Sequence, residues 1–422
     1  MNQKNMNEKN EKKKGYRNVL TQKQYMKFII ANLISRFGDS IDAIAFTWLV
    51  YQITGSASWS AIIFAVNQLP GIFLQPFAGA FVEGMNKKRI MVITDFIRGM
   101  VVVALAVLVL TDNVNPWVLL GFTVIISGVE AFCMPASTAI VPKIIDMEYY
   151  EYGSSLSRTL GTVVELIGMG LAGTIIGLFG IGTAILIDAV TFFGSAVVLA
   201  TLKVREENPM KTKANGREYL SNLKGGLVYL KQMPVIRNFC ILGVVANGIV
   251  VPINSLQSPM VSELMGQGPE FLSVFGIAFT ICIGVSAVLF PKVHERITAR
   301  TLVVGGGCFV GVGIYALTVT QYFRDQIFMI YAITIAACVL LGFGVGFMSS
   351  TLNVQFMKLV DQEYLARVGS IFNAGAMAAS PVVSFAVSGL TAYFSVGQIF
   401  VISSVLCVIL FMFVGIKKIA FE

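Results

Sequence analysis

Residues 26–52 read MKFIIANLISRFGDSIDAIAFTWLVYQ, an apolar run that is long enough to cross a bilayer and yet contains Asp39 and Asp42. Glu130 and Glu165 lie inside two later apolar runs. A charged side chain at the centre of a membrane helix costs about 2.5–3.5 kcal/mol on insertion scales. We therefore expect these four acids to face the interior of a helical bundle, to find partners or to carry protons.

The composition of the whole chain agrees with a membrane protein. Of its 422 residues, 56% are hydrophobic and 13% are charged, whereas soluble domains carry about 25% charged residues. Only helices and closed barrels satisfy the backbone in lipid. Because the apolar runs do not alternate in polarity as barrel strands do, we predict an all-α integral membrane protein.

The apolar runs predict twelve transmembrane helices in two six-helix, pseudo-symmetric bundles. The runs cover residues 26–52, 58–82, 90–111, 117–140, 154–179, 183–203, 236–262, 271–291, 301–320, 327–351, 369–392 and 397–416. Two bundles around a central path are typical of alternating-access transporters.

Four segments follow from this map. We predict a disordered tail over 1–24, a first bundle over 25–203, a linker over 204–235 and a second bundle over 236–417. Asn208-Pro209 and Asn215-Gly216 are turn signals inside the linker.

The placement of basic residues predicts the orientation in the membrane. They concentrate in the tail, the linker and the loops of the same side, and Arg324 is the one basic loop residue on the other side. Cytoplasmic loops of membrane proteins are enriched in Lys and Arg. We expect a multi-pass protein of the bacterial cytoplasmic membrane, with both termini in the cytoplasm. The net charge of +8 is thereby explained without a nucleic-acid partner.

No cofactor, metal site or enzyme constellation is expected. The six cysteines lie in apolar runs, and the single His294 cannot form a metal cluster. Gly342-x-Gly344-x-Gly346 is not followed by the Gly-Lys-Ser/Thr of a phosphate loop. We therefore expect an ion gradient, and protons in particular, to supply the energy.

The four acids are predicted to couple transport to protons, but each has an alternative interpretation. Arg36 precedes Asp39 by three residues, so the two could form a fixed ion pair within one helix and leave Asp39 a poor proton carrier. Asp42 is farther from Arg36. Glu130 and Glu165 have no basic residue within one helical turn, so each is either a proton carrier or a permanently neutral, hydrogen-bonded acid.

Neutral polar residues inside the apolar runs are candidates for substrate contact. They include Asn247, Asn254 and Gln257, which fit one helical stripe of the seventh run. The complete set of predicted substrate-binding residues is Arg36, Gln68, Asn247, Asn254, Gln257 and Asn373. Hydrogen bonds between helices are the alternative role for the amides.

Several motifs resemble the major facilitator superfamily, specifically its bacterial branch of macrolide and siderophore exporters. They are Arg36 to Ser40, Trp48 to Ser56, Leu69-Pro70, Pro76 to Gly79, Pro135 to Ser137, Leu186 to Phe192 and Arg367 to Ser370. The resemblance covers most of the first half and implies a drug:proton antiporter with this twelve-helix fold.

One loop departs from the family pattern. The family reads Gly-x-x-x-Asp-Arg-x-Gly followed by basic residues between spans two and three, whereas this chain has Glu83 for the acid, keeps Lys87 and Lys88, and lacks the arginine. The resemblance implies that this loop clamps the two halves, with Arg89 or Arg98 as substitutes for the missing arginine. Asp95 and Arg98 are spaced to pair with each other or with the adjacent loop, and we assign them a gating or structural role.

The sequence thus predicts a secondary active transporter that exports hydrophobic or cationic, drug-like small molecules in exchange for protons. We expect the chain to act as a monomer in contact with its substrate, protons and the lipid bilayer. A lipid or siderophore exporter or flippase, and an importer, remain alternatives. A transporter-like sensor is a different class, but its output module would have to fit in a longest loop of about 30 residues.

Overall fold

The computed structural model describes residues 16–83, 85–204, 225, 227–362 and 364–417. Its regular elements within these ranges are all helical. The prediction of a disordered tail over 1–24 does not hold at Tyr16–Val19, which form the short helix α2. The Tyr16 ring packs edge-on against Tyr152 at 5.6 Å between centroids. Residues 1–15 of the predicted tail, and most of the predicted linker, lie outside the described residues.

Six long helices form the first bundle. They are α3 (Lys23–Thr54), α4 (Ala57–Glu83), α5 (Lys87–Leu110), α6 (Pro116–Ile140), α7 (Tyr150–Phe179) and α8 (Ile181–Ala200). Local signals fix their ends. Gly55 stops α3 in the left-handed conformation at φ 57°, which favours glycine. Asn86 and Asn115 cap the first turns of α5 and α6.

Six further long helices form the second bundle. They are α10 (Pro234–Ser255), α12 (Glu270–His294), α13 (Ala299–Val319), α14 (Ile327–Leu359), α15 (Leu365–Leu390) and α16 (Val396–Lys417). The predicted run 236–262 is not one straight helix, because α10 ends at Ser255. Two short pieces follow it, α11 (Gln257–Pro259) and the π-helix η3 (Met260–Met265).

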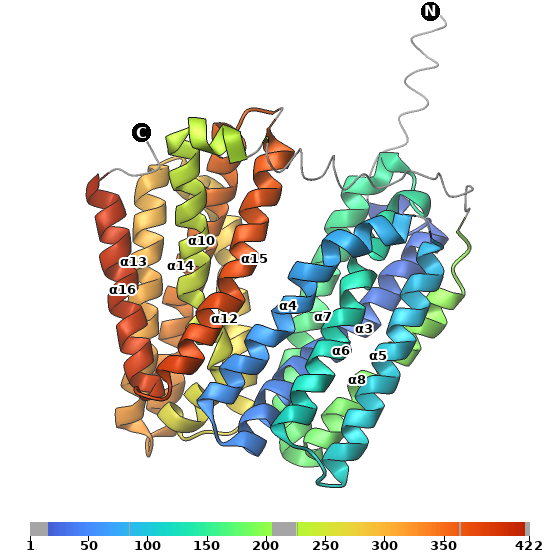
Figure 1. Cartoon of the computed structure of the whole chain (residues 1–422), viewed down its shortest axis with the longest axis horizontal. Helices are drawn as coiled ribbons and strands as arrows, with labels where there is room; N and C mark the ends of the chain where they lie inside the picture. Colours follow the sequence, from blue (N-terminus) through green and yellow to red (C-terminus); the bar gives the residue numbers. More distant parts are fainter. Residues whose placement is uncertain (1–15, 84, 205–224, 226, 363, 418–422) are drawn as a thin grey trace, which may run out of the picture.

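The two bundles lie side by side, with α3–α8 on the right and α10–α16 on the left in Figure 1. The beginning of α3 and the end of α16 lie at the top of that view. We call this end of the molecule the termini side and the opposite end the far side. Helix α3 therefore runs from the termini side at Lys23 to the far side at Thr54.

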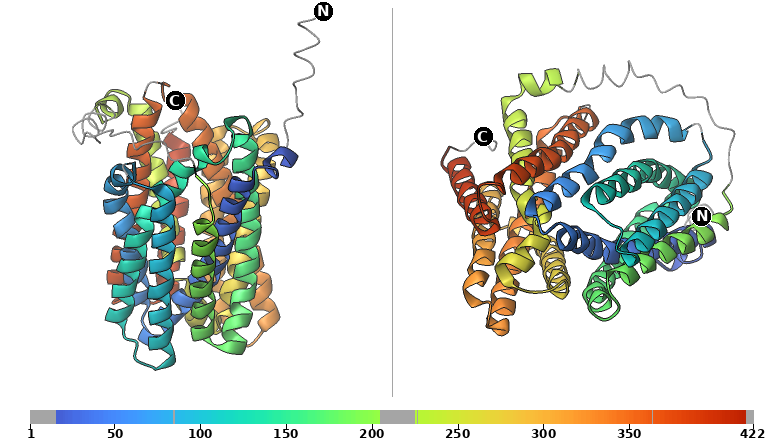
Figure 2. Two further views of the ribbon diagram at one scale, coloured as in Figure 1. Left: turned by 90° about the vertical axis from the view of Figure 1, so that its right-hand side faces the viewer. Right: turned by 60° about the horizontal axis from the view of Figure 1, so that its bottom comes forward.

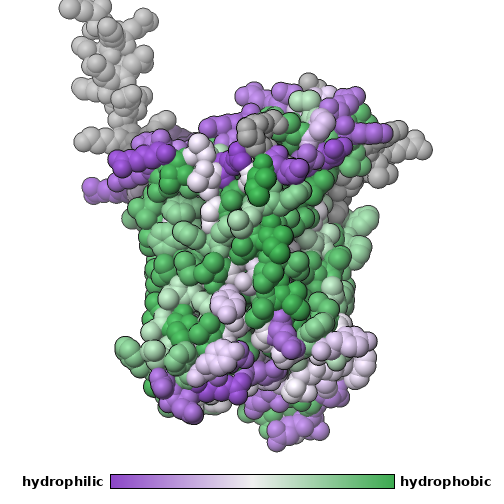
Figure 3. Space-filling view, turned by 90° about the vertical axis from the view of Figure 1, so that its left-hand side faces the viewer, coloured by the Kyte–Doolittle hydropathy of each residue, from purple (hydrophilic) through white to green (hydrophobic). Residues whose placement is uncertain are grey.

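The apolar surface agrees with a membrane-spanning protein. Eleven of the described helices are long and apolar enough to cross a membrane. Helix α3, which carries Arg36, Asp39 and Asp42, is long but is not among them. Figure 3 shows a broad hydrophobic belt between two hydrophilic ends. The all-helical membrane fold is thus confirmed, whereas the count of twelve spans stays a prediction.

Hydrogen bonds join the two bundles near the far side. Tyr51 donates to Glu263 (3.0 Å), and the hydroxyls of Ser58 and Ser388 lie 2.7 Å apart. The remaining bonds run from Ser384 Oγ to the carbonyl of Ala61 (2.8 Å) and from the Gly173 amide to Ser273 (2.9 Å). The packing of α4 against α15 and of α7 against α12 accompanies them, and Figure 2 shows α4 beside the second bundle. These contacts seal the far side.

Candidate functional site

A cavity of about 540 Å³ lies on the inner face of the first bundle, and all four predicted coupling acids line it. Its other charged residues are Arg36 and Arg98. The apolar and neutral lining residues are Ser40, Ala43, Phe46, Thr47, Val50, Ser60, Ile63, Phe64, Asn67, Ile126, Met169, Asn254 and Ser255. At its far-side end, Val50 and Ser60 adjoin the sealing contacts of Tyr51 and Ala61.

Two ion pairs connect different helices across this cavity. Arg98 of α5 contacts Asp39 of α3 at 2.8 Å, and Arg36 of α3 contacts Glu165 of α7 at 3.0 Å. The alternative in which Arg36 pairs with Asp39 is therefore wrong. Residues three apart on a helix can meet, but partners on neighbouring helices lie closer here. Glu165, which has no basic neighbour along its own helix, obtains one from α3.

Arg98 is the most enclosed of the cavity charges. Its side chain is 10% exposed, and its guanidinium lies 4.1 Å from the centre of the Phe192 ring. The expected Asp95–Arg98 ion pair does not form. Asp95 accepts a hydrogen bond from Ser195 of α8 at 2.6 Å instead. Asp95 therefore fastens α5 to α8, and Arg98 is free to reach α3.

Two carboxyl groups near the Arg98–Asp39 ion pair, those of Asp42 and Asp188, have few or long hydrogen bonds. One oxygen of Asp42 is buried and has no hydrogen-bond partner among the described residues. Asp188 of α8 is 1% exposed, and its side chain receives one long hydrogen bond, from Thr191 at 3.5 Å. Asp188 had no role among the predictions from sequence. Its signal was an acid inside the run 183–203, similar to the signal of the other four acids.

Glu130 of α6 lines the cavity and is exposed to it. The described residues give its carboxylate no hydrogen bond and no ion pair within contact distance. Its charge does act on Arg98 from across the cavity. Glu130 is thus the cavity acid that is most accessible to a cationic ligand.

The predicted substrate-binding residues divide into two groups. Arg36 and Asn254 line the cavity. Gln68, Asn247, Gln257 and Asn373 are not among its lining residues, and Asn67 takes the place of Gln68. The helical stripe of Asn247, Asn254 and Gln257 is interrupted because α10 ends between the last two.

One contact of the expected gating loop lies within the first bundle. Lys88 donates to the carbonyl of Leu202 at 2.8 Å, and Lys87 has a contact of its own. The side chain of Glu83 lies outside the described residues. Arg98 does not replace the missing loop arginine, because it is committed to Asp39. Within the described part of the chain, no hydrogen bond from Lys88 reaches the second bundle. A loop that clamps the two halves is expected to be released in this way when the termini side is open.

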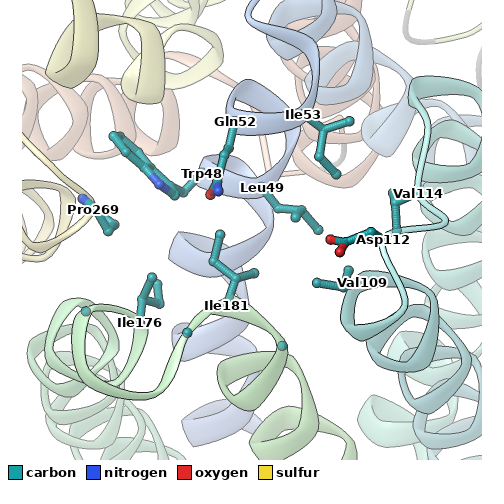
Figure 4. A pocket seen from close by; sticks show the side chains of 13 residues that line it. Trp48, Leu49, Gln52, Ile53, Val109, Asp112, Val114, Ile176, Ile181 and Pro269 are labelled. Atoms are coloured by element: carbon teal, nitrogen blue, oxygen red, sulfur yellow. The ribbon is translucent and has the colours of Figure 1, made fainter.

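A second cavity, of about 590 Å³, opens at the far side (Figure 4). Trp48, Leu49 and Gln52 of α3 point into it, and Asp112 is the one charged side chain among its lining residues. It is separate from the acid-lined cavity, since the two share no lining residue. With one carboxylate at its edge, it lacks the paired charges of the first cavity.

The acid-lined cavity can exchange one cation for another. Four carboxylates face two guanidinium groups there, so binding a proton or an organic cation lowers the excess of negative charge. Among the described residues, no group of three His, Cys, Asp or Glu side chains is arranged to hold a metal ion.

Comparisons with known proteins identify the family of the chain. Residues 28–383 match the family described as Major Facilitator Superfamily. The multidrug efflux pump Tap of Mycolicibacterium fortuitum is 24% identical over 368 residues, which are 84% of this chain and 85% of that protein. Macrolide efflux protein A of Streptococcus pyogenes is 20% identical over 341 residues, which are 80% of this chain and 82% of that protein.

Solved structures share the fold at low identity. The nucleoside transporter NupG superposes with a TM-score of 0.74 at 12% identity, covering 92% of this chain and 98% of that one. A bacterial homologue of the iron transporter ferroportin, in an inward-facing state, gives 0.69 at 14% identity, with 95% and 99% coverage. At these identities the likeness concerns the fold alone.

Proposed function

The chain belongs to the Major Facilitator Superfamily, and from this premise we propose that it is a proton-coupled exporter of hydrophobic or cationic small molecules. The family and the transporter class are shared with its curated relatives, which are named as multidrug and macrolide efflux pumps. The observation that carries the proposal is the cavity in which four carboxylates face two arginines.

The charge of the cavity favours a cationic substrate over an anionic one. An anionic siderophore would need basic groups, yet Arg36 and Arg98 are both occupied by carboxylates. Glu130 is accessible and unpaired among the described residues, so an organic cation would meet an open negative charge. Phe46, Phe64 and Met169 supply apolar surface beside it, as a mostly apolar ligand requires.

The cytoplasm lies, in this proposal, on the termini side. The far-side loops that are described contain one basic residue, Arg324, whereas Lys88, Lys143 and Lys203 lie on the termini side. Because the far side is sealed by hydrogen bonds between the bundles, the conformation is an inward-facing one. An exporter would load its substrate in this state.

The direct test uses purified protein in proteoliposomes and a fluorescent lipophilic cation such as ethidium. With protein inserted so that its cytoplasmic side faces outward, an acidic lumen should drive ethidium into the vesicles against its gradient. Collapse of the pH gradient by nigericin should stop the accumulation. Ethidium movement that is the same with and without the pH gradient would contradict proton coupling.

A matched pair of variants ties this test to the cavity. Glu130→Gln removes the accessible carboxylate, and we expect accumulation to fall at least about tenfold, the effect of losing about 1.4 kcal/mol of binding. Glu148→Gln changes an acid in the loop before α7 and should leave accumulation at the wild-type level. Equal activity of both variants would remove Glu130 from the substrate path.

A further inference from the structure

Asp188 lies where α3 and α8 approach most closely. A side chain added at Gly38 of α3 would collide with the Asp188 carboxylate and with the Thr191 hydroxyl. The absence of a side chain at Gly38 therefore lets α3 pack directly over this acid. Asp188 is 1% exposed, and a buried carboxylate without strong donors is costly unless it holds a proton or has a cation beside it.

The charged groups around Asp188 come from two of the helices packed on α8. Asp42 and Asp39 of α3 and Arg98 of α5 act on it, with Asp42 the strongest. Helix α7 also packs on α8 but supplies none of these charges. Asp95 of α5 accepts a hydrogen bond from Ser195. Asp188 and Asp42 are thus two neighbouring acids beside one arginine, and Asp42 also lines the cavity.

Hydrogen bonding is incomplete at both Asp42 and Arg98. One oxygen of Asp42 and the Nε of Arg98 are each buried without a hydrogen-bond partner among the described residues. The side chain of Arg98 is nine-tenths buried, and its NH2 group is the part that contacts Asp39. Buried groups without partners mark a place where a ligand or a second arrangement completes the bonding.

We propose that Asp42 and Asp188 form a buried proton-binding site, and that Arg98 exchanges Asp39 for this site when a cationic substrate binds. This inference rests on the proposed function and gives it a mechanism. In the conformation described here Arg98 neutralises Asp39, and the two buried acids share one proton, because two neighbouring carboxylates in a dry site cannot both ionise without a cation.

The exchange balances in charge and in atoms. An organic cation pairs with Asp39 and displaces Arg98, which turns to Asp42 and Asp188. One O–H bond in that pair breaks, and the proton leaves to cavity water, because Arg98 now neutralises the second carboxylate. One positive charge enters and one leaves. The acids thereby divide into a substrate group, with which the organic cation pairs, and a proton group of Asp42 and Asp188, to which Arg98 turns.

A proton fits this site better than a sodium ion does. Sodium, like other hard cations, is held by several oxygen ligands, whereas Thr191 is the one further side-chain oxygen that contacts Asp188 among the described residues. In the described part of the chain, no group of three His, Cys, Asp or Glu side chains is placed so that it could hold a metal ion. A requirement for sodium would therefore show that sodium, and not a proton, is the coupling ion.

The test measures protons released when tetraphenylphosphonium binds to the purified full-length protein in weakly buffered, sodium-free solution. Wild type should release about one proton per bound cation, and its Kd should fall about tenfold for each unit of rising pH, as linkage of one proton requires. Asp188→Asn should bind the cation within about threefold of wild type, release none and lose the pH dependence.

The outcomes separate this inference from the proposed function. If wild type releases a proton and Asp188→Asn does so equally, the buried site is refuted while proton coupling stands. If wild type binds the cation without any proton release, coupling itself fails. Asp95→Asn removes an equally buried acid that has its own donor, and it should keep the release. If Asp188→Asn does not fold, Asp42→Asn carries the same prediction. A requirement for sodium would overturn the proposal.

Discussion

The two bundles share a fold and differ in what they bury. In the first bundle, Asp95, Arg98 and Asp188 are buried. In α10–α16, the buried polar side chains with less than a tenth of their surface exposed are all Ser or Thr among the described residues. Close helix contacts occur in both bundles, at Gly38 in the first for example, but in the second they are not accompanied by buried charges among the described residues. Gly306 and Gly344 bring the backbones of α13 and α14 together, so that a Cβ at Gly344 would lie 2.6 Å from the Gly306 carbonyl.

This difference gives the two bundles different roles in transport. Charges inside a membrane protein are costly and have alternative partners, so the first bundle can change its arrangement when a proton or cation binds. Small-residue contacts have one close-packed arrangement, so the second bundle moves as a unit. We infer that ion coupling resides in the first bundle and rigidity in the second.

The largest expected effect comes from Asp39→Asn, which leaves Arg98 buried without its acid. Removing one partner of a buried ion pair costs about 3–5 kcal/mol, and somewhat less here because the Asp39 side chain is 42% exposed. We expect gradient-driven ethidium accumulation in proteoliposomes to fall about a hundredfold, which corresponds to about 2.7 kcal/mol. Asp39→Glu keeps the charge and should retain part of the activity. Ethidium accumulation at the wild-type level in Asp39→Asn would contradict the assignment of ion coupling to the first bundle.

The second prediction probes rigidity through two adjacent glycines of α13. A Cβ at Gly306 would lie 2.8 Å from the Gly344 carbonyl, whereas a Cβ at Gly305 meets nothing within 4 Å. Overpacking costs about 1–3 kcal/mol, so Gly306→Ala should unfold at a lower temperature than wild type. Gly305→Ala should not, since Ala favours a helix over Gly by about 1 kcal/mol. Thermal unfolding of both purified variants is the measurement, and equal destabilisation would contradict close packing at Gly306.

The third prediction concerns the seal between the bundles. Tyr51→Phe removes the hydrogen bond to Glu263, which we value at about 1 kcal/mol, so the outward-open population should rise about fivefold. A cysteine at Asn67, placed in a cysteine-free background, should then react faster with a membrane-impermeant maleimide added from the far side. Thr54→Val alters a hydroxyl that bonds to Val50 and Ser56 of the same bundle and should leave the labelling rate unchanged. Unchanged labelling in Tyr51→Phe would show that this bond does not hold the seal.

The smallest effect on stability is expected at the Arg36–Glu165 pair. Its side chains are 55% and 38% exposed, and exposed ion pairs contribute about 0–1 kcal/mol. Arg36→Gln should therefore shift thermal unfolding little. It should nevertheless tighten binding of tetraphenylphosphonium, because Glu165 then becomes available to the cation. Weaker binding in Arg36→Gln would place Arg36 in direct support of the substrate.

Much of the fold was predictable from the sequence, because apolar runs and their caps are local signals. The run 26–52 corresponds to α3 and the run 90–111 to α5, with ends fixed by Gly55 and Asn86. The break after Ser255 was missed, since an apolar run looks the same whether it forms one helix or a helix followed by a π-turn.

The candidate site was predictable in its acids and not in their partners. Asp39, Asp42, Glu130 and Glu165 stand out because acids are rare in apolar runs, and the structure places all four around one cavity. The partners depend on helix rotation and packing, so Arg98 was assigned to Asp95 instead of Asp39. Asp188 carried the same signal and was given no role.

The most direct test of the central claim measures proton movement driven by substrate alone. Proteoliposomes with the cytoplasmic side outward receive tetraphenylphosphonium outside, at equal pH on both sides, and a trapped dye reports the luminal pH. The account predicts that cation entry makes the lumen alkaline, that Asp42→Asn in the first bundle abolishes this change, and that Asn373→Ala in the second preserves it. Cation entry into wild-type vesicles at constant luminal pH would contradict the account.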